Sequence, residues 1–203
     1  TAYLAWSAEL TARAADALGR PAEAVRWREL GDAVRQAFQR AFLLPDGRLK
    51  GETQTALALA LGMGLLPDEQ RAAAVARLVA DVESRGNHLS TGFVGTSWLL
   101  DALASGGRAD VAYRLLLQDT WPSWGFMLRH GATTVWERWD GWTPERGFQD
   151  AGMNSFNHYA FGCAVQFLYE TVAGLRPDPR APGFERFIVD PVPGGGLTWA
   201  RAE

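Results

Sequence analysis

The segment at residues 52–63 limits the possible folds more than any other, because it has the length of a helix and almost no polar face. At its centre lies an unbroken apolar run: Ala56, Leu57, Ala58, Leu59, Ala60 and Leu61. A helix that is apolar on all sides must be covered on all sides. We therefore expect an inner helix surrounded by other elements.

Most of the remaining chain supplies the helices that such an arrangement needs. Apolar residues recur at helical spacing over about residues 1–18, 21–42, 67–84, 94–104, 109–118 and 155–172. Because amphipathic segments alternate with nearly all-apolar ones, we expect a two-layer helical array. Five prolines follow Gly174, and residues 184–189 and 197–200 have the pattern of short strands. The expected fold is mostly α, with the start of a β-domain after it.

The composition argues against several kinds of partner. The formal net charge is −3 and the basic residues are scattered, which disfavours a nucleic-acid surface. The longest apolar run, residues 55–66, is too short to span a bilayer. Cys163 is the only cysteine, so the chain can form neither an intrachain disulfide nor a cysteine-based metal site. We expect no metal and no cofactor, and we leave the compartment open, with the cytoplasm favoured over secretion.

Tryptophan is concentrated in one short stretch. Five of the nine tryptophans lie in residues 121–142, and Glu137 stands among them in the sequence GATTVWERWDG at residues 131–141. Indole rings offer rigid apolar faces with one N–H donor, and the C–H faces of a sugar ring stack well on them. A carboxylate in such surroundings can take up a proton or bind a hydroxyl. The residues predict a sugar site on a loop of about 25 residues, a length that is more often functional than idle.

Both residues singled out in this region also have a simpler interpretation. Glu137 can pair with an arginine at a loop anchor, and Arg138 and Arg146 are candidates for holding it ionised. His158, expected in the first turn of the last helix, can cap or fill a loop–helix junction. Asp140 is most simply a solvated loop residue. The residue pattern alone leaves these alternatives open.

Three segments together resemble the bacterial α-L-rhamnosidases of glycoside hydrolase family 78. They are PSWGFM at residues 122–127, GATTVWERWDG at residues 131–141 and SFNHYAFG at residues 155–162. The resemblance implies an (α/α)6 barrel followed by a C-terminal β-sandwich, and hydrolysis of terminal α-L-rhamnose with inversion. It implies that Glu137 is the general base and that His158 lines the rhamnose pocket.

The motif of the family's general acid, which lies far upstream, has no match in this chain. We therefore expect residues 1–175 to be the second half of the barrel and residues 176–203 to be a linker and the first strands of the β-domain. This chain alone should be inactive. Trp124, Trp136 and Trp139 are expected to shape the sugar face, and a rhamnose-containing glycoside is the expected partner.

Two alternatives to a rhamnosidase remain at this point. One is a helical-barrel enzyme that acts on another sugar, and the other is a non-catalytic sugar-binding module.

A half barrel should also expose apolar surface of its inner helices, for example residues 56–61, and this surface offers a route to self-association.

Overall fold

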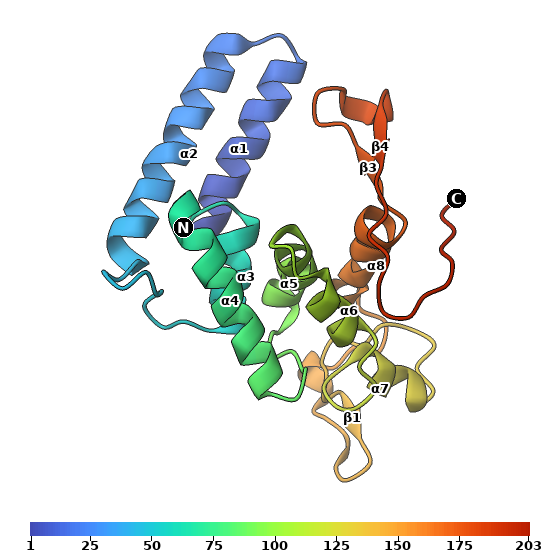
Figure 1. The fold of residues 1–203 in the computed structure, drawn as a ribbon. Helices are drawn as coiled ribbons and strands as arrows, with labels where there is room; N and C mark the ends of the chain where they lie inside the picture. Colours follow the sequence, from blue (N-terminus) through green and yellow to red (C-terminus); the bar gives the residue numbers. More distant parts are fainter.

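The structure, a computed structural model, describes all 203 residues and is mostly helical (Figure 1). All six helices predicted before residue 120 are present, and a seventh, short helix follows before residue 130. They are α1 (Ala2–Ala17), α2 (Pro21–Phe42), α3 (Gln54–Gly62), α4 (Asp68–Ser84), α5 (Phe93–Ser105), α6 (Ala109–Leu116) and α7 (Trp124–Arg129).

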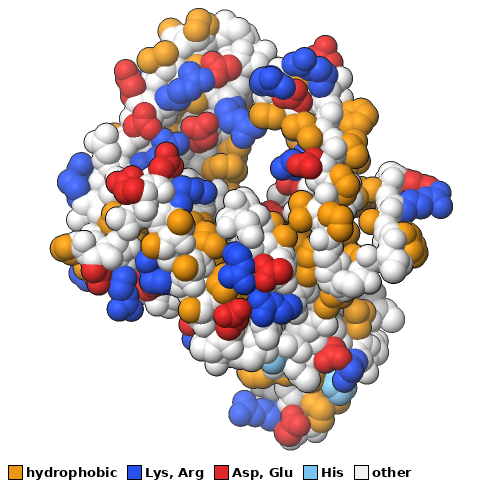
Figure 2. All heavy atoms as spheres, in the orientation of Figure 1, with side chains coloured by type: hydrophobic (Ala, Val, Ile, Leu, Met, Phe, Trp, Pro, Cys, Tyr) orange, Lys and Arg blue, Asp and Glu red, His pale blue; other side chains and the backbone are white.

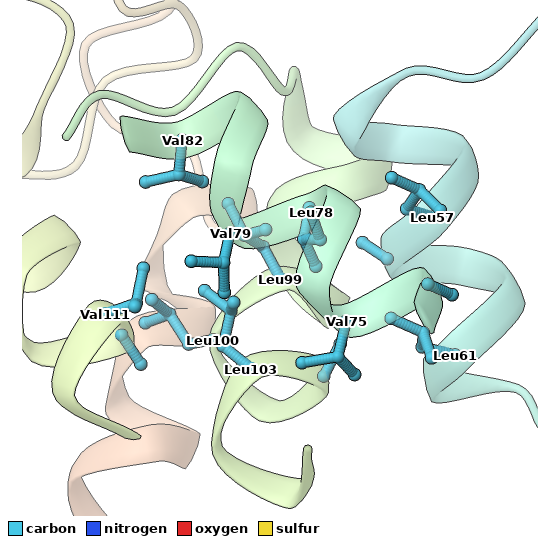
Figure 3. Packing of buried hydrophobic residues seen from close by; sticks show 14 of the residues in the cluster. Leu57, Leu61, Val75, Leu78, Val79, Val82, Leu99, Leu100, Leu103 and Val111 are labelled. Atoms are coloured by element: carbon cyan, nitrogen blue, oxygen red, sulfur yellow. The ribbon is translucent and has the colours of Figure 1, made fainter. Parts of the chain in front are cut away.

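Helix α3 is the inner helix that the sequence predicts. It packs against α4 and α5, and Leu57, Ala58 and Leu61 are buried. Figure 3 shows Leu57 and Leu61 beside the valines and leucines of α4 and α5. Together α3 to α6 form a continuous core, which we call the helical layer.

Helices α1 and α2 form a hairpin that packs mostly against itself. The contact face of α1 is a stripe of small residues (Ala5, Ala8, Ala12 and Ala15), which lets the two helices approach closely. The hairpin joins the helical layer through the start of α1 and through Val34 and Phe38 of α2. At this junction the rings of Trp6 and Trp98 meet edge to face with centroids 5.1 Å apart. Figure 2 shows an opening through the molecule between this hairpin and the C-terminal strands.

The expected exposure of residues 56–61 is wrong. Four of these six side chains are buried and the other two are half-buried, because α4, α5 and the start of α1 cover them. Exposed apolar side chains lie instead on α1, namely Tyr3, Leu4 and Leu10, and directly after it at Leu18.

The helix predicted for residues 155–172 is shorter and changes pitch. A 3₁₀ turn, η2 (Ala160–Cys163), leads into α8 (Ala164–Phe167) and then a π-helical turn, η3 (Leu168–Val172). Residues 155–159 are not helical, because the backbone N–H of His158 and the carbonyl of Ser155 bond instead to the preceding loop.

The C-terminal strands are confirmed only in part. Strand β3 (Leu175–Pro177) pairs with β4 (Phe187–Val189), which lies within the predicted segment 184–189, and the two run antiparallel with Arg176 opposite Ile188. The turn η4 (Pro182–Phe184) lies between them. Residues 197–200 do not form the predicted strand, since no neighbouring strand lies beside them to bond with. No helix of the molecule has the length and apolar character needed to cross a membrane.

Candidate active site

The tryptophan-rich loop between α7 and η2 is closed by its own polar groups. It contains a small hairpin of β1 (Trp142–Thr143) and β2 (Gly147–Phe148) and a 3₁₀ turn, η1 (Ala151–Met153). The side-chain amide of Asn154 donates to the carbonyl of Gly141 at 2.9 Å and to that of Gln149 at 3.3 Å. These bonds fold the loop into a compact unit, which we call the base loop (residues 130–159).

The two ends of the base loop lie side by side and exchange backbone hydrogen bonds. The N–H of Glu137 donates to the carbonyl of Ser155 at 2.9 Å, and the N–H of His158 donates to the carbonyl of Val135 at 2.8 Å. The hydroxyl of Thr134 also donates to the carbonyl of Phe156. This pairing brings Glu137 and His158 together although they lie 21 positions apart in the sequence.

Glu137 has one carboxylate oxygen fixed and the other turned toward His158. Its Oε2 accepts a hydrogen bond from the backbone N–H of Ser155 at 2.8 Å. Its Oε1 lies 4.0 Å from Nε2 of His158, and the side chain is only 15% exposed. No arginine pairs with Glu137, so the simpler interpretation as one half of a loop ion pair does not describe it.

Glu137 lines a cavity of about 390 Å³. The walls come from four parts of the chain: residues 89–93, Trp121 and Pro122, residues 137–140, and Met153 with Phe161. Six of the 13 lining residues are hydrophobic, and they surround a few polar groups, which is the usual make-up of a small-molecule site.

Trp139 is the predicted sugar-site tryptophan that lies beside Glu137 in this cavity. Its ring stacks on Phe161 with centroids 3.8 Å apart and an interplanar angle of 15°. Its Nε1–H donates to the carbonyl of Thr91 at 2.8 Å. The indole thus joins the base loop to the segment before α5, and its only N–H is already used within the protein.

Trp124 and Trp136 do not line the cavity. The Nε1–H of Trp124 donates to the carbonyl of Phe161 at 2.8 Å, and its ring meets Trp139 edge to face. Trp136 is 5% exposed and packs with Phe126 and other apolar side chains in a small second core. Both residues therefore occupy supporting positions behind the cavity wall, whereas Trp121, which is 52% exposed, lies at the cavity itself.

Asp140 is paired rather than simply solvated. Nε and one terminal nitrogen of Arg138 donate to its two carboxylate oxygens at 2.9 and 3.0 Å. This bidentate hydrogen bond holds the pKa of Asp140 below its usual range. Arg138 is thus engaged with Asp140, and both side chains line the cavity beside Glu137.

His158 lies just before η2 and not in the first turn of a helix. Its Nδ1 accepts a hydrogen bond from the backbone N–H of Ala160 at 3.3 Å, which is part of the junction role considered from the sequence. Its ring faces Tyr159 and lies 6.2 Å, centroid to centroid, from Phe93.

Sequence reasoning missed three groups at the site. Met153 and Phe93 line the cavity, but an isolated methionine in a loop, or a phenylalanine at the start of a helix, carries no signal for this. Ser155 acts through its backbone N–H, which any residue supplies. Its only signal is its place in the SFNHYAFG segment. No group of three or more His, Cys, Asp or Glu side chains is arranged to hold a metal ion.

Comparison with known proteins gives one consistent family. The model for the bacterial α-L-rhamnosidase six-hairpin glycosidase domain matches residues 1–172. An α-L-rhamnosidase of Streptomyces avermitilis is 50% identical over 202 residues, which cover 100% of this chain and 19% of that protein. One of Formosa agariphila is 39% identical over 204 residues, covering 100% of this chain and 22% of that protein.

Solved structures agree with the sequence comparison. The crystal structure of the Streptomyces avermitilis α-L-rhamnosidase complexed with L-rhamnose superposes with a TM-score of 0.90 at 48% identity, covering 96% of this chain and 19% of that one. The native enzyme from Aspergillus terreus gives a TM-score of 0.91 at 37% identity, covering 96% and 22%.

This chain spans about a fifth of the length of these relatives. The match extends over the helical layer, the base loop and the helical turns up to Val172. The chain therefore belongs to the family of bacterial α-L-rhamnosidase six-hairpin glycosidase domains.

Proposed function

We propose that this chain forms the general-base side of the active site of an inverting α-L-rhamnosidase. The observation that supports this proposal most strongly is the position of Glu137. It is a half-buried carboxylate on a cavity wall, with one oxygen hydrogen-bonded to the Ser155 N–H and the other directed toward His158. The solved relative with bound L-rhamnose supports rhamnose as the sugar.

The geometry of Glu137 suits removal of a proton from water. The Ser155 N–H holds Oε2, so that Oε1 remains available as the acceptor. An inverting glycosidase needs this base on one face of the sugar and a carboxylic acid on the other, with the two carboxyl groups about 6.5–9.5 Å apart.

The acid of this reaction must come from outside the chain. Asp140 is the only other carboxylate that lines the cavity. Because Arg138 lowers its pKa, Asp140 is ionised at neutral pH and has no proton to give to a leaving oxygen. A carboxyl group in the part of the relatives that this chain does not span fits that role, and this chain alone should be inactive.

The other predicted site residues divide into two roles. We assign Trp139, together with the neighbouring Trp121, to the cavity wall, where an indole face can meet the sugar. His158 does not line this cavity, and we assign it to a position beside Glu137 at the cavity's edge. Trp124 and Trp136 act indirectly, because they support Trp139 and the base loop from the core side.

The division of the chain into residues 1–175 and 176–203 is also part of the proposal. Most of the second segment is exposed, and it contains β4 and all of β3 except Leu175, as expected for strands that begin a further domain. The exposed apolar side chains of α1 favour self-association when this chain is studied alone. Size-exclusion chromatography tests this, and a well-behaved monomer would count against it.

The decisive variant is Glu137→Gln in the longer enzyme that carries this segment. A general base contributes about 10²–10⁴-fold, so we expect hydrolysis of an aryl α-L-rhamnoside to fall by at least about 100-fold. Glu145→Gln is the matched control, because Glu145 is an exposed glutamate on the same loop. Near-normal turnover of the Glu137 variant would refute the proposal.

Two further measurements address the alternatives. A panel of aryl glycosides tests whether another sugar is preferred, since this chain holds only part of the pocket. Titration calorimetry with L-rhamnose tests for a binding module, which would hold rhamnose without turning over any rhamnoside.

A further inference from the structure

The hydrogen bond between Ala160 and His158 determines where the imidazole carries its proton. A backbone N–H can only donate, so the nitrogen it reaches must be an acceptor. The Ala160 N–H lies 3.3 Å from Nδ1 of His158, and Nδ1 is therefore unprotonated. A neutral imidazole has one protonated nitrogen, which leaves the proton of His158 on Nε2.

The same chain contains a histidine with the opposite arrangement. Nδ1 of His88 lies 2.8 Å from the carbonyl oxygen of Arg85, which can only accept, so Nδ1 carries the proton there. Its Nε2 lies 2.8 Å from the hydroxyl oxygen of Thr120, whose single O–H also reaches Oε1 of Gln118 at 2.9 Å. The third histidine, His130, packs against the rings of Phe126 and Trp142 without a hydrogen bond from either ring nitrogen to the protein.

The protonated nitrogen of His158 is the one that faces Glu137. Nε2 and Oε1 lie 4.0 Å apart, which is beyond a direct hydrogen bond. An oxygen placed about 2.8 Å from each would bridge them with an angle of roughly 90°. Such an oxygen accepts from the Nε2–H and donates to the carboxylate, so it must belong to an O–H group.

We propose that the Ala160 N–H fixes His158 as an Nε2–H donor, and that His158 orients the water that Glu137 deprotonates. The water donates one hydrogen to Oε1 and accepts from Nε2, which leaves its second lone pair for the anomeric carbon. His158 is then a positioning residue for the nucleophile. The tautomer stands independently of the reaction, whereas the role of the water rests on the proposed function.

The tautomer is tested by ¹⁵N NMR of the imidazole rings in the 203-residue chain, at an alkaline pH where histidine side chains are neutral. Protonated and unprotonated ring nitrogens have well-separated ¹⁵N shifts. We expect His158 to show a protonated Nε2, His88 to show a protonated Nδ1, and His130 to show a mixture. A protonated Nδ1 or a mixture at His158 would overturn the proposal, and the result does not depend on any activity.

The role of the water is tested with two variants in the longer enzyme. The amide N–H of His158→Gln reaches about as far as Nε2, whereas that of His158→Asn reaches only as far as Nδ1. We expect His158→Asn to lower kcat by about 10- to 100-fold with little change in KM, and His158→Gln to retain most of kcat.

The other outcomes are equally informative. A rise in KM with kcat unchanged would mean that His158 binds a sugar hydroxyl, and equal losses in both variants would mean that the Nε2 donor is irrelevant. Either result would overturn the water-orienting role. A wild-type enzyme without activity toward rhamnosides would instead reject the proposed function, while the NMR result would still stand.

Discussion

The helical layer and the base loop are held together by different interactions. In the helical layer, leucines and valines of α3 to α6 bury one another, and Leu78, Leu99 and Leu103 have no exposed surface. The base loop has only a small core of its own and depends on directed hydrogen bonds and stacked rings, such as Glu137 to Ser155 and Trp139 to Phe161. Apolar burial tolerates small shifts, whereas directed bonds fix the position of a carboxylate. The difference predicts that substitutions in the helical layer change stability, while those in the base loop change activity more than stability.

The largest loss of stability is expected in the helical layer. Leu99→Ala removes a fully buried side chain from α5, and such replacements cost about 2–5 kcal/mol because they remove apolar burial and leave a cavity. Urea unfolding of the 203-residue chain measures this loss. A loss below about 1 kcal/mol would show that the layer is loosely packed and would break the contrast with the base loop.

Asp101 is an exception within the helical layer, because its replacement should raise the free energy of unfolding and not lower it. Burial, together with the nearby Glu170 carboxylate, raises the pKa of Asp101 to about 6. Because the folded-state pKa lies above the ordinary value, the folded state favours the protonated acid, and stability is lost as the pH rises through about 6. We expect Asp101→Asn to raise the free energy of unfolding at pH 7.5 by on the order of 2 kcal/mol.

The control for Asp101→Asn is the pH dependence. The gain should disappear below about pH 4, where the aspartic acid is protonated in both the folded and the unfolded state. Equal stability of the two proteins from pH 4 to pH 8 would show that Asp101 is well solvated or paired.

Trp139→Phe is expected to change stability least among these substitutions and to lower activity more than stability. Phenylalanine keeps a ring to stack on Phe161. It loses the N–H bond to the Thr91 carbonyl, which costs about 1 kcal/mol, and part of the packed indole surface. We expect activity of the longer enzyme to fall about tenfold or more, because a displaced base loop moves Glu137. Steady-state kinetics and thermal unfolding of the same preparation separate the effect on activity from the effect on stability. The control is Trp27→Phe, which changes a tryptophan of α2 far from the base loop in sequence. A loss of stability without a loss of activity would contradict the role of the base loop.

Periodicity predicted the helical layer well, because an all-apolar helix such as α3 has to be covered by its neighbours. It could not show that this chain itself supplies the cover for residues 56–61, whose exposure was wrongly expected from a half barrel. It failed where tertiary bonds replace local ones. His158 was expected in a helix, but its backbone N–H bonds to Val135, and η2 begins only at Ala160. The general-base role proposed for Glu137 comes from the motif, whereas the contact with Ser155 depends on how the loop closes. Trp136 and Trp139 are alike in the sequence, and only the folded loop separates a core ring from a cavity wall.

The most direct test of the account is azide rescue of Glu137→Ala in the longer enzyme. Removal of the carboxylate leaves space beside His158, and azide is an anionic nucleophile that needs no base. If Glu137 deprotonates the attacking water, azide should raise the rate on an aryl α-L-rhamnoside in proportion to its concentration and give β-L-rhamnosyl azide. A variant that folds and binds rhamnose but gains no rate from azide, or one that hydrolyses the substrate at the wild-type rate without azide, would contradict the assignment of Glu137 as the general base.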